Sequence, residues 1–177
     1  MQTLKKKIEK TLPELKKELK QKNKMAIPRL IKVVVNVGTG RARDKKRDEL
    51  VVDRLAKITG QKAVARGAKK SIASFKVRQG EIVGYSVTLR GQKMYDFLDM
   101  LLNVAMPRIR DFKGYSEKSL DEMGNLTIGI KEHIIFPQTA DEEVRDIFGF
   151  SVTIQTTAKN KKEASIFFKA LGFPFKK

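Results

Sequence analysis

Hydrophobic residues near the start of this 177-residue chain recur with the period of an α-helix. Residues 1–24 therefore predict a basic helical segment, in which apolar side chains form one stripe and lysines occupy most other positions. Thr11 and Pro13 in its middle indicate that the helix is capped a second time there. The apolar stripe consists of Leu4, Ile8, Leu12, Leu15 and Leu19.

The next segments change to the alternating period of β-strands. The β-branched run from Leu30 to Val37 ends at Gly38 and predicts a largely buried strand. Because side chains alternate along a strand, Lys32 and Asn36 share one of its faces. Alternation or short β-branched runs predict four more strands, at residues 62–66, 81–90, 126–131 and 150–157.

Helical spacing returns between these strands. It predicts helices over residues 48–58, 94–106 and 161–171, and a short acidic helix around residues 141–144. Residues 67–80 have no clear period and are rich in small and basic residues, so they predict an extended basic loop. Interleaved strands and helices predict an α+β fold, a single domain over residues 1–177. We expect a mainly antiparallel five-stranded sheet with helices packed on one face and the other face free.

Charge is distributed unevenly along the chain, which has a formal net charge of +18. Residues 1–24 hold nine basic and three acidic side chains, residues 25–93 seventeen and five, and residues 94–177 twelve and twelve. Between Arg54 and Gly80, eight Lys or Arg residues occur without one Asp or Glu. Such a concentration favours a surface that binds a phosphate backbone. We expect the neutral C-terminal half to face a different partner.

The composition argues against catalysis, metal binding and membrane insertion. The chain has no cysteine and one histidine, His133, so thiolate metal sites and disulfides are excluded and no nucleophile with its base is evident. Gly38-Thr39-Gly40 lacks the third glycine of a dinucleotide-binding loop, because Arg43 stands there. No signal peptide or membrane-spanning run is evident. We therefore expect a cytoplasmic non-enzyme with no cofactor, metal, small-molecule substrate or membrane partner.

A folded RNA is the partner that these features favour. Lys32 and Asn36 would share a sheet face with Thr88 and Arg90 on a neighbouring strand, and these side chains suit phosphate and 2′-hydroxyl groups. Few aromatic residues are available to stack on single-stranded bases, which favours recognition of RNA shape and backbone. Phe75, in the basic loop, either stacks on RNA or anchors the loop to its own domain, and both interpretations stay open.

Eight short motifs stand out along the chain: Gly60-Gln61-Lys62, Ala68-Lys69-Lys70-Ser71, Phe75-Lys76-Val77-Arg78-Gln79-Gly80, Val87-Thr88-Leu89-Arg90-Gly91, Pro107-Arg108-Ile109-Arg110-Asp111-Phe112, Ile134-Ile135-Phe136-Pro137, Thr156-Thr157-Ala158 and Gly172-Phe173-Pro174-Phe175. Together they resemble the bacterial large-subunit ribosomal proteins that bind 5S ribosomal RNA, the L-five family. The resemblance runs from about Met25 to Lys177, and residues 1–24 match only as a helix. The chain departs from the family pattern at Glu122-Met123 and at Ser151.

The resemblance implies a non-enzymatic role in translation, with three contacts in the ribosome. The protein would attach 5S rRNA in the central protuberance of the large subunit, among large-subunit rRNA and neighbouring ribosomal proteins. It would touch P-site tRNA through the basic loop and form an intersubunit bridge to a small-subunit head protein.

The resemblance also assigns residues to each of these contacts. The implied 5S rRNA-binding residues are Lys32, Asn36, Gln61, Lys62, Arg66, Thr88 and Arg90. The implied tRNA-contacting residues are Lys69, Lys70, Ser71, Ser74, Phe75, Lys76 and Arg78. The implied bridge residues are Arg108, Arg110, Asp111, Phe112, Asp141 and Glu142.

Two other functions stay open on the residues alone. A free general RNA-binding protein or RNA chaperone would use the basic loop on many RNAs, and competition with unrelated RNA would distinguish it from a 5S rRNA-binding protein. A nucleotide-using enzyme built around Gly38-Thr39-Gly40 would bind free nucleotides in solution, and we expect no such binding.

Overall fold

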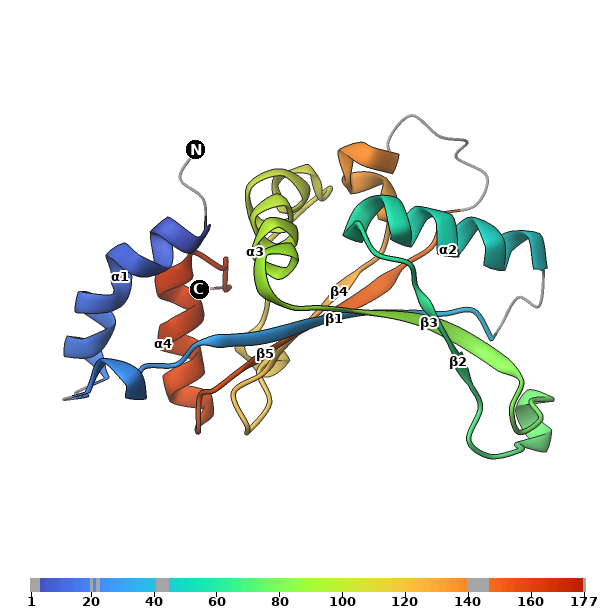
Figure 1. Ribbon diagram of the computed structural model, residues 1–177, viewed down its shortest axis with the longest axis horizontal. Coiled ribbons are helices and arrows are strands. Elements are labelled where there is room, and N and C mark those ends of the chain that lie inside the picture. Colours follow the sequence, from blue (N-terminus) through green and yellow to red (C-terminus); the bar gives the residue numbers. More distant parts are fainter. Residues whose placement is uncertain (1–3, 20, 22, 41–44, 140–146, 177) are drawn as a thin grey trace. The chain divides into compact units, whose positions relative to one another are not determined.

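Five β-strands form one sheet, and the described residues also form four α-helices (Figure 1). This computed structural model describes residues 4–19, 21, 23–40, 45–139 and 147–176. The antiparallel strands lie in the order β2-β3-β1-β5-β4. The α+β class and the five strands predicted from the sequence are thus confirmed. The strands are β1 Leu30–Gly38, β2 Val64–Gly67, β3 Ile82–Leu89, β4 Leu126–Ile130 and β5 Phe150–Thr156, and the helices are α1 Leu4–Glu18, α2 Lys45–Thr59, α3 Gly91–Met100 and α4 Lys161–Leu171.

The chain divides into two compact units. Unit 1 consists of residues 1–33, 90–128 and 153–177, and it contains α1, α3 and α4. Unit 2 consists of residues 34–89 and 129–152, and it contains α2, β2 and β3. The other three strands contribute residues to both units. The organisation as a single domain stays a prediction.

The core of unit 1 lies where α1 packs against α3 and α4. Leu4 and Leu15 are the buried residues of α1, and α4 buries Ala164, Phe167, Phe168 and Leu171. Within the described residues, the predicted helix therefore forms from Leu4 to Glu18 with part of its apolar stripe buried, and α4 begins and ends at the predicted residues.

The prediction of a second cap within α1 is wrong. The helix is continuous from Leu4 to Glu18 and contains Pro13. The Thr11 hydroxyl does not cap a new helix start. It donates to the carbonyl oxygens of Lys7 at 3.0 Å and Ile8 at 3.1 Å. A hydroxyl bonded back to the preceding turn is compatible with a helix interior.

The helix predicted at residues 94–106 begins earlier, at Gly91, and changes its winding after Met100. Residues Leu101–Ala105 form a π-helical turn, and Met106–Arg108 form a 3₁₀ turn that contains Pro107. Proline has no N–H group, so regular α-helical hydrogen bonding cannot continue through it.

In unit 2, helix α2 packs against β3. Val51, Leu55 and Ile58 are buried, and the helix ends at Gly60, where φ is +64° and the N–H group donates to the Ala56 carbonyl at 2.8 Å. A glycine in the left-handed conformation is a common end for a helix, because it lacks the Cβ that would strain this backbone. Strand β2 starts two residues later than predicted, at Val64.

The two faces of the sheet in unit 2 differ in burial. The Tyr85 hydroxyl on β3 donates to Asp48 Oδ2 of α2 at 3.4 Å, so the face of β3 that carries Tyr85 is the one that α2 covers. Val35 and Val37 of β1 are buried, whereas Asn36 between them is exposed. Strand β1 therefore has one buried and one open face, which corrects the expectation of a largely buried strand.

Residues 68–81 connect β2 to β3, and they are more regular than the extended loop predicted from the sequence. Ile72 and Val77 exchange two backbone hydrogen bonds, at 2.9 and 3.2 Å, around a 3₁₀ turn at Ala73–Phe75. Ala68 N–H also donates to the Glu81 carbonyl at 2.8 Å. We call residues 68–81 the β2–β3 arm. Most of its residues are exposed, and its internal hydrogen bonding differs from the extended loop predicted.

Candidate nucleic-acid interface

The uncovered face of the sheet in unit 2 carries polar side chains from three neighbouring strands. Asn36 on β1 is exposed, and Thr88 on β3 is half-buried on the side opposite Tyr85. The Ser151 hydroxyl on β5 donates to the Asn36 backbone carbonyl at 3.4 Å. Together with Arg66, these residues form what we call the open face, which offers an amide, hydroxyls and a guanidinium to a ligand.

Arg66 is held on the open face by β3. Its Nε donates to the Ser86 hydroxyl at 2.6 Å, and Ser86 pairs with Val64 in the antiparallel register of β2 and β3. This contact uses one of the five N–H donors of the guanidinium. The side chain remains exposed, so the other donors can reach a phosphate.

Gln61 and Lys62 lie just beyond the end of α2, and both are exposed. The Thr59 hydroxyl donates to the Leu55 carbonyl at 2.7 Å and to the Gln61 carbonyl at 3.0 Å. These bonds fix the backbone between the helix and β2. The exposed side chains of Gln61 and Lys62 are therefore carried by an ordered turn of the backbone.

Two of the predicted 5S rRNA-binding residues belong to unit 1. Lys32 is half-buried on β1, and exposed Arg90 is the first residue before α3. In the same unit, the hydroxyl oxygens of Thr127 on β4 and Thr153 on β5 lie 3.2 Å apart.

Polar residues of β5 were missed in the prediction of the site. Ser151, Thr153 and Gln155 alternate with buried neighbours along this strand. The signal was available in the sequence, because every second residue of the predicted strand is polar. Ser86 was also missed, and no periodic signal distinguishes it in the sequence.

The β2–β3 arm exposes each of the seven residues predicted to contact tRNA. Phe75 is 72% exposed at the 3₁₀ turn, and Lys76 follows it with a left-handed φ of 52°. The Ser71 hydroxyl accepts a hydrogen bond from Gln79 N–H at 2.9 Å, which ties the two sides of the arm together. The seven residues are Lys69, Lys70, Ser71, Ser74, Phe75, Lys76 and Arg78.

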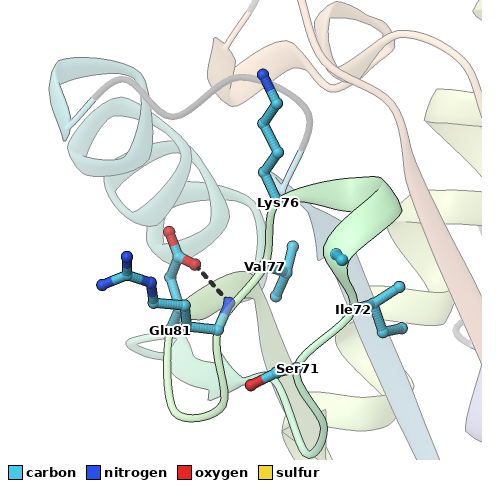
Figure 2. Close-up of a pocket in the computed structure, with 7 residues that line it drawn as sticks. Ser71, Ile72, Lys76, Val77 and Glu81 are labelled. Atoms are coloured by element: carbon cyan, nitrogen blue, oxygen red, sulfur yellow. Dashed lines mark hydrogen bonds between the residues drawn. The ribbon is translucent and has the colours of Figure 1, made fainter.

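An open pocket lies on this arm (Figure 2). The Lys76 side chain extends away from Ser71 and Glu81, while the Glu81 carboxylate turns back and accepts a hydrogen bond from Arg78 N–H at 3.0 Å. The arm thus combines apolar side chains with cations. The pocket lining consists of Ser71, Ile72, Ala73, Lys76, Val77, Arg78 and Glu81.

The predicted bridge segment is anchored to the C-terminal residues of unit 1. Tyr115 N–H donates to the Pro174 carbonyl at 2.9 Å, and Lys176 N–H donates to the Tyr115 carbonyl at 2.9 Å. Half-buried Phe112 packs edge-to-face on Tyr115 with ring centroids 5.1 Å apart. Burial raises the pKa of the Tyr115 hydroxyl to about 12.

Charged residues of this segment project into solvent. Arg108, Arg110 and Asp111 are exposed, and Arg110 Nε lies 3.9 Å from Asp111 Oδ2. Asp141, Glu142 and the acidic helix predicted around residues 141–144 lie outside the described residues.

His133 is buried in unit 2 and does not lie among exposed polar groups. Its ring stacks on Phe148 at 4.3 Å, and its Nδ1 accepts a hydrogen bond from Phe148 N–H at 3.4 Å. Burial, followed by the positive charge of Arg54, lowers the pKa of His133 below its usual value. His133 is therefore held in the interior of unit 2 by Phe148.

No three His, Asp or Glu side chains gather as a metal site within residues 4–19, 21, 23–40, 45–139 and 147–176. Among the described helices, none has both the length and the apolar character needed to cross a membrane.

Known proteins similar to this chain decide its family. Residues 23–78 match the family model described as "Ribosomal protein L5", and residues 82–175 match the model of the C-terminus of the same ribosomal family. The chain belongs to the ribosomal L5 family. It is a structural constituent of the large ribosomal subunit and not an enzyme, which confirms the class of function expected from the sequence. Its expected place in the cytoplasmic ribosome is confirmed on the same ground.

Individual L5 relatives extend the match to nearly the whole chain. The large ribosomal subunit protein uL5 of Mycoplasma mycoides is 49% identical over 167 residues, which cover 94% of this chain and 93% of that protein. The uL5 of Ureaplasma parvum is 49% identical over 169 residues, or 95% and 92%. The uL5 of Halothermothrix orenii is 49% identical over 168 residues, or 94% of each chain.

Proposed function

We propose that this L5 family member binds 5S rRNA through the open face and holds it in the central protuberance. The observation that carries this assignment is the open face itself, where Asn36, Thr88 and Arg66 lie together on neighbouring strands that α2 leaves uncovered. Amide, hydroxyl and guanidinium groups suit the 2′-hydroxyls and phosphates along the wide minor groove of an RNA helix.

P-site tRNA is the second proposed partner, bound by the β2–β3 arm. The arm presents four exposed Lys or Arg side chains around the exposed ring of Phe75. A ring of this kind can stack on an unpaired base, while the cations around it meet phosphates. Exposure of Phe75 supports RNA stacking over an anchoring role in its own domain.

A small-subunit head protein is the third proposed partner, which would contact the segment from Arg108 to Phe112. Two arginines and one aspartate are exposed there. Their backbone is fixed through Tyr115, so these charges project from an ordered support. Lost subunit joining in ribosomes that carry Arg108→Glu and Arg110→Glu would support this contact. Unchanged joining at limiting Mg²⁺ in a sucrose gradient would contradict it.

A gel-shift experiment tests the 5S rRNA assignment. Purified protein is mixed with 5S rRNA at about 150 mM salt, where attraction between exposed charges is screened beyond about 8 Å. Excess tRNA and duplex RNA are then added as competitors. We expect the 5S rRNA band to stay shifted, and loss of the shift to either competitor would favour a general RNA-binding protein or RNA chaperone instead.

Charge reversal in the arm tests the tRNA assignment. Ribosomes assembled with Lys70→Glu or Lys76→Glu should retain P-site tRNA less well, because each change places a carboxylate where a cation meets phosphate. Lys131→Glu reverses an exposed lysine of unit 2 outside the arm and serves as the matched control. Equal tRNA retention in all three variants and the wild type would contradict the assignment.

A further inference from the structure

Two lysine-rich segments that are far apart in the sequence lie side by side in unit 1. Residues 1–24 hold nine lysines and three acidic residues, and residues 159–177 hold six lysines and one acidic residue. Their helices, α1 and α4, pack against each other (Figure 1). Lys7 of α1 lines the same small pocket as Leu171 and Gly172, so the start of α1 lies beside the end of α4. We call α1 and α4 the helix pair.

The α1 side of the helix pair has one buried face and one cationic face. Leu4 and Leu15 are 2% and 0% exposed. On the opposite side, Lys6, Lys10 and Lys17 recur with helical spacing and are all exposed. Because an α-helix rises about 1.5 Å per residue, this row is about 16 Å long. The three acidic residues of α1 lie beside the row: Glu9, Glu14 and Glu18.

Helix α4 also has buried apolar side chains and exposed lysines. Phe167 and Phe168 are 1% and 0% exposed, whereas Lys161, Lys162 and Lys169 are exposed. Lys169 Nζ lies 2.7 Å from a carboxylate oxygen of Glu117 at the edge of the pair. Both helices therefore use their apolar side chains to hold each other and leave lysines for solvent.

The chemistry of this surface suits a phosphate backbone better than bases or lipid. All basic residues of α1 and α4 are lysines, which act as point charges on phosphates, whereas arginine is the usual reader of base edges. Both aromatic residues of the helix pair are buried, so stacking on single-stranded bases is not available. A lipid surface would need the apolar face of α1, which the protein itself covers.

We propose that the helix pair is a second RNA-binding surface, which binds the phosphate backbone of a double-stranded RNA segment. It is built from different residues than the open face and the β2–β3 arm. The lysines of α1 lie along one line on a rigid helix, so they can follow a backbone, and α4 of the same unit also exposes lysines. The inference stands on the geometry of unit 1 and does not depend on 5S rRNA as the partner of the open face.

The salt dependence of binding tests this surface. A labelled RNA duplex of about 20 base pairs, unrelated to 5S rRNA, is titrated with the wild-type protein and with the triple variant Lys6→Gln, Lys10→Gln and Lys17→Gln at several KCl concentrations. Each lysine on a phosphate contributes about 1 to the slope of log K against log salt. We expect the slope of the triple variant to be smaller by about 3, with weaker binding at low salt.

A matched control uses the same helix and the same new side chain. The variant Glu9→Gln, Glu14→Gln and Glu18→Gln should bind the duplex as tightly as the wild type or more tightly. Thermal unfolding followed by circular dichroism verifies that both variants fold. Should the lysine variant not fold, Lys161→Gln with Lys162→Gln on α4 replaces it, with an expected slope change of about 2.

Equal slopes for the lysine variant and the wild type would overturn the proposal, because the helix pair would then meet an acidic protein or only solvent. This result is distinguishable from a wrong 5S rRNA assignment, since the duplex contains no 5S sequence. A second measurement adds the duplex to a preformed complex with 5S rRNA. Formation of a ternary complex by the wild type but not by the lysine variant would support two separate surfaces.

Discussion

The β2–β3 arm and the helix pair both present lysines to solvent, but they hold them by different means. No side chain from residue 68 to residue 81 is fully buried, and backbone hydrogen bonds such as the pair between Ile72 and Val77 maintain its form. In the helix pair, buried side chains such as Leu15 and Phe168 share helices with the exposed lysines. The comparison teaches that side chains of the arm can be changed without disturbing a core, whereas the buried side chains of the helix pair cannot.

The largest expected difference between the two regions comes from removing one phenylalanine in each. Phe168→Ala empties a fully buried position of α4 and should lower the free energy of unfolding by about 3–5 kcal/mol. Phe75→Ala, at a position 72% exposed on the arm, should change it by less than about 0.5 kcal/mol. Urea unfolding measures both. Equal losses of unfolding free energy in the two variants would contradict the difference between the arm and the helix pair.

A smaller loss of unfolding free energy is expected from a substitution at the end of α4. Gly172 has a φ of +88°, so Gly172→Ala should cost about 1–2 kcal/mol of unfolding free energy through its left-handed backbone. Gly129→Ala is the control, because an added Cβ there meets no atom within 4 Å and the φ is not positive. A variant at Gly172 as stable as the wild type would contradict the strain argument.

A pH effect on stability near neutral pH is expected from His133, which is the only histidine of the sequence and lies in unit 2. Its lowered pKa in the folded protein means that the unfolded chain binds the proton more readily. Stability should therefore be fully present above the unfolded pKa of about 6.5 and decrease as the pH falls from there toward the folded pKa.

Urea unfolding at several pH values between about 5 and 8 measures this effect. His133→Leu should remove the histidine part of the pH dependence, although it also loses the hydrogen bond from Phe148 N–H. A variant with the same pH profile as the wild type would show that another group titrates in this range.

The smallest change in the free energy of unfolding is expected at the edge of the helix pair, where Glu117 meets Lys169. Glu117→Gln removes the ion pair with Lys169, whose side chains are 51% and 55% exposed. Lys169 lowers the pKa of Glu117, so any contribution of the pair is lost as the pH falls. Water screens such exposed pairs, and we expect no measurable change in urea unfolding at neutral pH. A clear loss of stability would mean that the ion pair between Glu117 and Lys169 contributes to the stability of unit 1.

Much of the fold was predictable because its elements are periodic. Ala164, Phe167, Phe168 and Leu171 recur with helical spacing inside the helix predicted at residues 161–171, and alternation places Asn36 on the opposite face of β1 from Val35 and Val37. These signals are local, so the sequence contains them directly.

Other features depend on contacts between distant residues or on backbone angles. The linear charge map treats the second half of the chain as neutral, yet the fold packs the lysine-bearing helix α4 against α1. The form of the arm depends on a left-handed φ at Lys76, which no residue type there indicates. The contact of Ser151 with Asn36 joins positions 115 residues apart.

The most direct test of the account is the affinity for 5S rRNA of a chain that lacks residues 72–79. The remaining residues can still close a short turn, since Ala68 N–H bonds to Glu81 and Gly80 N–H bonds to Ala68. The account predicts wild-type affinity for this truncated chain. It predicts affinity about fivefold to tenfold lower for Asn36→Ala and for Thr88→Ala, because each loses a hydrogen-bonding group of the open face. Loss of 5S rRNA binding on truncation, with both substitutions binding as the wild type does, would contradict it.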